Sequence, residues 1–137
     1  MPTPLKIAVV DDDQIYQFIM QRTFDRISPE SKILNFSNCG DFYLFLKHNS
    51  SDPTLIPDLV LLDLNTPFMN GWEFLDAFKE LEKSLAKIPE IYLVTSSVDP
   101  NDLEMAKGPE LLTGFFVKPL KPEQVLEVIH KIAVKLE

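Results

Sequence analysis

The sequence has few of the features that mark secreted, membrane or nucleic-acid-binding proteins. Its 137 residues contain one cysteine, Cys39, which excludes a disulfide framework or a cysteine zinc cluster and favours a reduced, cytoplasmic setting. No run approaches about 20 consecutive apolar residues, so we expect no membrane span, and no signal peptide is evident. A basic excess is also missing. The net charge of −8 argues against nonspecific nucleic-acid binding, because no cationic surplus can neutralise phosphates.

Repeats and low-complexity segments are absent too, which excludes solenoids and disordered tracts. The composition, 45% hydrophobic and 25% charged, is that of an ordinary globular protein. The length suits one domain, and we expect a single domain over residues 1–137 with a core over about 5–135. No linker or DNA-binding segment follows the last expected helix, so the chain is either a stand-alone domain or a fragment of a longer regulator.

Five short apolar runs predict strands, at residues 6–10, 32–37, 59–64, 91–96 and 114–118. The first, third and fourth are almost continuously apolar, which is typical of strands that are buried on both faces of a parallel sheet. Segments with helical spacing lie between and after them. The alternation predicts an α/β fold, a doubly wound parallel sheet with helices on both faces.

The expected helices differ in how clearly they are marked. The spacing predicts helices over residues 14–27, 40–48, 71–88 and 121–136. In the first, one apolar stripe is formed largely by Ile15, Phe18, Ile19 and Ile27. The fourth connection is irregular: Asp99 can cap a helix and Pro100 suits its first position, but Gly108-Pro109 interrupts the pattern. We expect about two helical turns there.

Ligands of such sheets bind beyond the carboxyl ends of the strands, so the residues at those ends are the candidates for a site. They are Asp11-Asp12-Asp13, Asp63, Thr95-Ser96-Ser97 and Lys118-Pro119. Asp13 directly precedes a helix and is explained by helix capping alone. A cluster of the other acids would repel itself unless a cation neutralised it, and Mg²⁺ prefers such hard oxygen ligands. Lys118 could then pair with Asp63 and later with a phosphoryl oxygen.

Four motifs in a fixed order give the sequence its resemblance to a known family. "VVDD" (9–12), "LLDLNTPFMNG" (61–71), "LVTSS" (93–97) and "FFVKP" (115–119) resemble the response-regulator receiver domain, the CheY-like module of two-component signalling. The resemblance covers about residues 5–135. It implies a flavodoxin-like sheet of strand order 2-1-3-4-5. It also implies a signalling domain that takes part in its own phosphorylation and dephosphorylation, rather than an enzyme.

The resemblance implies a role for each matching residue. Asp63 is expected to be the phosphoacceptor. Mg²⁺, with Mn²⁺ or Ca²⁺ as substitutes, is expected on Asp12, Asp63 and the backbone carbonyl of Asn65, with Asp11 acting mainly through metal-bound water. Lys118 is expected to contact the acyl phosphate.

Other matching positions are expected to control or transmit the phosphorylation. Thr95 corresponds to the switch hydroxyl and Phe115 to the switch aromatic residue, although Phe115 is also explained as a permanently buried core ring. Pro119 is expected to follow a cis peptide bond. Asn65, Ser96 and Ser97 are expected to modulate access to the site.

The implied partners are proteins. They are a sensor histidine kinase or a His-phosphotransfer protein, and a downstream target on the face of the fourth helix, fifth strand and fifth helix. A homodimer is left open, and no membrane or nucleic-acid contact is implied. The segment 105–114 lacks the small residues that the family often has there, so that face is expected to be unusual.

Three alternative functions share parts of this pattern. A receiver-like module that docks a partner without phosphorylation would need none of the site residues. A haloacid-dehalogenase-type phosphohydrolase would need a second Asp two residues after Asp63, where the sequence has Asn65. A flavodoxin-like carrier would need a phosphate cradle where the chain has three acids.

Overall fold

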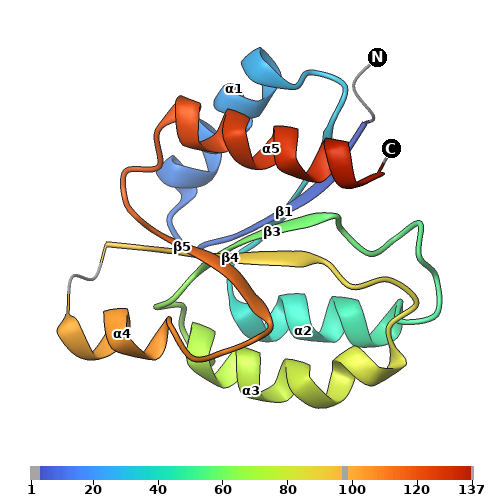
Figure 1. Ribbon diagram of the computed structural model, residues 1–137, viewed down its shortest axis with the longest axis vertical. Coiled ribbons are helices and arrows are strands. Elements are labelled where there is room, and N and C mark those ends of the chain that lie inside the picture. The colour runs from blue at the N-terminus through green and yellow to red at the C-terminus, as the bar shows by residue number, and fades with distance from the viewer. Residues whose placement is uncertain (1–3, 97–98, 137) are drawn as a thin grey trace.

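The protein forms a five-stranded parallel sheet. The computed structural model describes residues 4–96 and 99–136 (Figure 1). The strands are β1 (Lys6–Val10), β2 (Lys32–Phe36), β3 (Leu59–Asp63), β4 (Glu90–Thr95) and β5 (Leu112–Val117). Their order in the sheet is β2-β1-β3-β4-β5 and all neighbours are parallel, which confirms the predicted topology.

Helices cover both faces of the sheet (Figure 1). They are α1 (Gln14–Ile27), α2 (Cys39–His48), α3 (Gly71–Leu81), α4 (Pro100–Met105) and α5 (Pro122–Leu136), with a 3-10 turn, η1 (Glu82–Ser84), after α3. One buried cluster joins the sheet to α1 and α5, and another joins its opposite face to α2 and α3. The side chains of β3 are all buried because both clusters include residues of this strand.

Side-chain caps begin the helices that follow β1, β3 and β4. The Asp13 carboxylate accepts from the amides of Ile15 at 2.9 Å and Tyr16 at 3.2 Å, which confirms its capping role. Asn70 and Glu73 form a reciprocal capping box at α3. Asp99 caps the short α4, as the sequence predicts.

The apolar stripe predicted for α1 is largely on the wrong face. Ile15, Phe18 and Ile19 are exposed, at 73%, 63% and 52%, whereas Met20 and Phe24 are buried. Residues 20, 24 and 27 are spaced four and three apart and share the face that packs on the sheet. Ile27 alone of the predicted stripe lies on that side, partly buried against the core.

The third helix is shorter than predicted. α3 ends at Leu81 and the chain tightens into η1, after which Leu85 adopts an extended conformation. The amide of Ala86 donates to the carbonyl of Ser50 at 2.7 Å, which fixes the turn into β4. Leu85 still packs against the core from outside the helix, so its apolar spacing did not require helical backbone.

The described part of the chain contains no helix that is both long and apolar enough to cross a bilayer.

Candidate functional site

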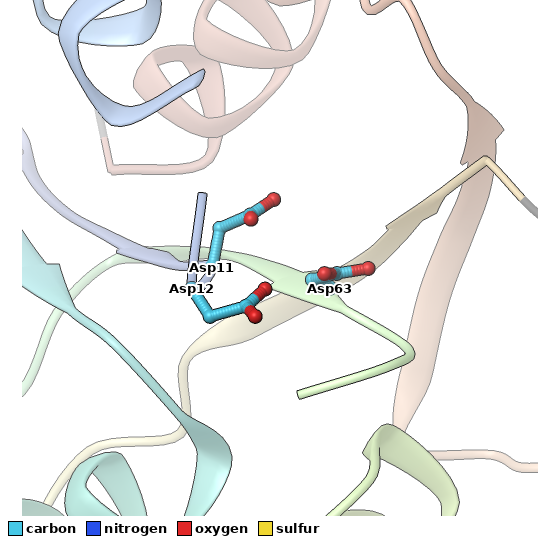
Figure 2. Close-up of side chains that lie close together, drawn as sticks. All are labelled: Asp11, Asp12 and Asp63. Atoms are coloured by element: carbon cyan, nitrogen blue, oxygen red, sulfur yellow. The ribbon is translucent and has the colours of Figure 1, made fainter. Parts of the chain in front are cut away.

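Three carboxylates meet at the carboxyl end of the sheet. Asp11 and Asp12 directly follow β1, and Asp63 ends the neighbouring strand β3. Each offers one oxygen, and these oxygens lie within 4.8 Å of one another. Figure 2 shows the three side chains close together at this edge of the sheet. Asp11 and Asp63 are buried, at 2% and 8% exposure, and Asp12 is exposed, so the predicted acidic pocket is present.

Burial and repulsion act together on Asp63. The pKa of Asp63 is raised to about 6, chiefly by burial and then by the charge of Asp11, while Lys118 opposes the rise. The backbone amide of Asn65, which donates to Asp63 Oδ1 at 3.3 Å, also lowers the pKa. A divalent cation fits this donor set, because three hard carboxylate oxygens within 4.8 Å can share one ion and its charge removes the repulsion.

Lys118 pairs chiefly with Asp11. Its Nζ lies 2.6 Å from Asp11 Oδ2 and 3.9 Å from Asp63 Oδ2. The predicted contact with Asp63 is therefore present, but it is the longer of the two. Asp11 is more deeply buried than Asp63. An ion pair between Asp11 and the ammonium group therefore stabilises the fold more than a pair between Asp63 and the same group. Asp11 Oδ1 accepts from the amide of Asp13 at 2.9 Å. Both oxygens of Asp11 are therefore engaged by the protein.

The other predicted residues lie along β4 and β5. Thr95 ends β4 and is fully buried, and its carbonyl accepts from the amide of Lys118 at 2.8 Å. Phe115 is half-buried against the core cluster that includes α2 and α3. Ser96 is exposed, and Ser97 lies outside the described residues. The peptide bond between Lys118 and Pro119 is cis, as predicted.

The loop after Asp63 is held by contacts that the sequence analysis did not assign. The Thr66 hydroxyl donates to the carbonyl of Met69 at 2.6 Å and accepts from the amide of Cys39 at 3.1 Å. The amide of Gly71 donates to the carbonyl of Leu64 at 2.7 Å. A side chain on Gly71 would lie 3.1 Å from the Leu64 Cα, so the close return of the loop favours glycine there.

Two residues of α1 also contribute to the site and were missed. Gln17 Nε2 lies within 3.1 Å of the carbonyls of Val9, Asp11 and Phe36, and so ties α1 to the ends of β1 and β2. The ring of Tyr16 lies under Lys118, with Nζ 4.3 Å from the ring centroid. Burial, followed by the charges of Asp11 and Asp63, raises the pKa of Tyr16. Both contacts depend on the packing of α1, for which the sequence carries no local signal.

Comparisons with known proteins agree with this geometry. The family described as "Response regulator receiver domain" matches residues 7–130. Among curated proteins, the nitrate/nitrite response regulator protein NarL of Escherichia coli K12 is 28% identical over 130 residues, which cover 95% of this chain. The chain spans about half of that relative, 55% of its length.

Solved structures give the same result for the fold. A two-component response regulator from Cytophaga hutchinsonii superposes with a TM-score of 0.83 at 21% identity, covering 97% of this chain and 99% of that one. A two-component response regulator from Legionella pneumophila superposes with a TM-score of 0.78 at 25% identity, covering 96% and 98%.

Proposed function

The chain belongs to the response regulator receiver domain family, a class of signalling modules rather than classical enzymes, and we propose that it accepts a phosphoryl group on Asp63. The observation that carries this proposal is the convergence of Asp11, Asp12 and Asp63 within 4.8 Å, with Lys118 beside them. No single residue would suggest phosphorylation. Together they provide a nucleophile, a place for a cation and a fixed positive charge.

The proposed reaction is transfer from a phosphohistidine to the Asp63 carboxylate. A carboxylate oxygen forms a bond to phosphorus, and the bond between phosphorus and the donor nitrogen breaks. The electron pair of that bond remains on the imidazole, which takes up a proton. Lys118 Nζ, now 3.9 Å from Asp63 Oδ2, is placed to contact an oxygen of the transferred group.

We further propose that Mg²⁺ occupies the acidic pocket. Asp12, Asp63 and the backbone carbonyl of Asn65 would hold it directly, and Asp11 would act through water, because both Asp11 oxygens already have protein partners. When bound, Mg²⁺ would neutralise the carboxylates and stabilise charge on the transferred group. Mn²⁺ or Ca²⁺ could take its place because they also bind carboxylate oxygens.

Phosphorylation is proposed to change the face formed by α4, β5 and α5. Thr95 would donate to a phosphoryl oxygen, and Phe115 would fill the space that Thr95 leaves. The half-buried position of Phe115 supports this role, because a ring that is only partly covered has room to move. Asn65, Ser96 and Ser97 would set how water reaches the acyl phosphate.

The proposed partners follow from membership in the family. A receiver of a two-component system implies a histidine kinase, and we propose that this kinase or a His-phosphotransfer protein is the donor. The target would be a protein that binds the α4-β5-α5 face, and a second copy of the chain is one candidate. The single cysteine makes the cytoplasm the proposed setting.

The proposal is tested by incubating the protein with acetyl phosphate and Mg²⁺ and measuring its intact mass. We expect one added phosphoryl group, and no labelling of Asp63→Asn. Asp76→Asn is a matched control on exposed surface, since the Asp76 side chain is 83% exposed, and it should label like the wild type. Labelling of Asp63→Asn at the wild-type rate would refute the assignment. Sustained turnover of acetyl phosphate without a stable adduct would favour a hydrolase.

A further inference from the structure

The ammonium group of Lys118 is held from three directions. Asp11 Oδ2 lies 2.6 Å from Nζ, Asp63 Oδ2 lies 3.9 Å away, and the centroid of the Tyr16 ring lies 4.3 Å away. The Lys118 side chain is only 19% exposed, so water screens these interactions little. Two of the partners are carboxylates of the acidic pocket, and the third is an aromatic face contributed by α1.

The two carboxylates cannot hold Lys118 in the same way throughout the reaction. A cation in the pocket would draw on the charge of both, directly from Asp63 and through water from Asp11, and phosphorylation of Asp63 would remove one carboxylate altogether. The attraction between an ammonium group and the face of a ring does not depend on either event. Of these three contacts, the one with the Tyr16 ring is thus the one whose strength depends on neither event.

We propose that Tyr16 is a positioning residue that holds the Lys118 ammonium over the phosphoryl site through its ring face. This inference rests on the proposed function and adds to it a residue that acts on Asp63 chemistry through Lys118. The position of the ring is fixed by the fold. The amide of Tyr16 donates to the capping carboxylate of Asp13 at 3.2 Å, and the ring packs against the core beneath α1 and α5.

The environment of the Tyr16 hydroxyl allows the effect of the ring to be tested apart from that of a hydrogen bond. Its oxygen is buried and has no hydrogen-bond partner among the described residues. The ring is therefore placed by packing and by the backbone, and its hydroxyl does not tether it. Tyr16→Phe keeps the aromatic face and is the matched control, whereas Tyr16→Leu keeps an apolar side chain and removes the face.

The test is a double-mutant cycle on the rate of labelling by acetyl phosphate with saturating Mg²⁺. We expect Tyr16→Leu to slow labelling about tenfold in the wild-type background, from the size of a desolvated cation–π contact. In the Lys118→Ala background it should change the rate less than about twofold, because the group that it positions is gone. Tyr16→Phe should label at nearly the wild-type rate.

Two outcomes of the cycle would overturn the proposal. One is an equal slowing by Tyr16→Leu in both backgrounds, which would mean that Tyr16 acts on the fold or on another group. The other is a slowing by Tyr16→Phe as large as that by Tyr16→Leu, which would assign the effect to the hydroxyl. Thermal unfolding of each variant shows whether the compared proteins are folded.

A measurement that needs no phosphorylation keeps this inference separate from the proposed function. In proton NMR of the wild type, the ε-methylene protons of Lys118 should be shifted upfield by the ring current of Tyr16, and Tyr16→Phe should retain the shift. Unshifted protons in the wild type would show that the contact is absent in solution, and would overturn the proposal whatever the labelling result. Shifted protons in a wild type that accepts no phosphoryl group would refute the proposed function and the reactive role of Tyr16, but not the contact.

Discussion

Replacing Asp63 by Asn should stabilise the metal-free protein at neutral pH. The substitution keeps the shape of the side chain and removes a negative charge that the fold buries beside Asp11. The pKa of Asp63 rises from 3.8 to about 6 on folding, mainly through burial and then through the charge of Asp11. The folded protein thus favours the protonated form of this carboxyl group, and holding it ionised costs free energy.

The sign and size of the effect follow from proton linkage. Well below the unfolded pKa of 3.8 the carboxyl group is protonated in both states, and its contribution to stability is fully present. As the pH rises to about 6, the unfolded chain loses its proton first, and stability falls. A pKa change from 3.8 to about 6 corresponds to about 3 kcal/mol. At pH 7 the Asp63→Asn variant should regain most of this free energy of unfolding. For a chain of this length, the Tm of the variant should then be about 10 °C above that of the wild type.

The assay is thermal and urea unfolding in EDTA between pH 5 and pH 8, with Asp76→Asn as the control. The gain from Asp63→Asn should grow from pH 5 to pH 7 and then level off, while the exposed control changes little. Saturating Mg²⁺ should stabilise the wild type more than the variant and reduce the difference. A variant that is less stable than the wild type at pH 7 without metal would refute the claim that Asp63 is buried under repulsion.

Three further predictions concern the scaffold, and each is measured as a change in the urea midpoint. Gly114→Ala should cost about 1–3 kcal/mol, because a Cβ there would lie 2.7 Å from the ring of Tyr92, and unchanged stability would contradict this packing. Asp13→Ala should cost about 1 kcal/mol through loss of the α1 cap, and no loss would argue against that cap. Phe68→Gly should add about 0.5–1 kcal/mol, since Phe68 is 96% exposed with φ of 72°, and a loss would mean that the ring makes stabilising contacts.

The sequence was sufficient for the fold class and for the acidic residues at the strand ends, because both depend on local patterns. Continuous apolar runs identify buried parallel strands, and parallel strands bring their carboxyl ends to one edge of the sheet. The resemblance to the receiver family supplied the strand order that makes β1 and β3 neighbours, and this order brings Asp11 and Asp12 beside Asp63. Asp13 was assigned as a cap for the same reason, since capping depends on residues two and three positions later.

What the sequence could not provide depends on how helices rotate and where long side chains reach. The buried face of α1 was misassigned because the helix carries apolar residues on two faces, and only packing against the sheet selects Met20 and Phe24. The preference of Lys118 for Asp11 depends on relative burial of two carboxylates. Tyr16 lies on α1 and contacts Lys118, which is 102 residues later in the sequence. No rule of residue spacing predicts a contact at that separation.

The most direct test of the central claim is to locate the phosphoryl group. Protein labelled with acetyl phosphate and Mg²⁺ is treated with borohydride, which reduces an acyl phosphate to an alcohol, and the peptides are sequenced by mass spectrometry. The account predicts conversion of Asp63 to homoserine, with Asp11 and Asp12 unmodified. Conversion at another carboxylate, or labelling that borohydride does not change, would contradict it.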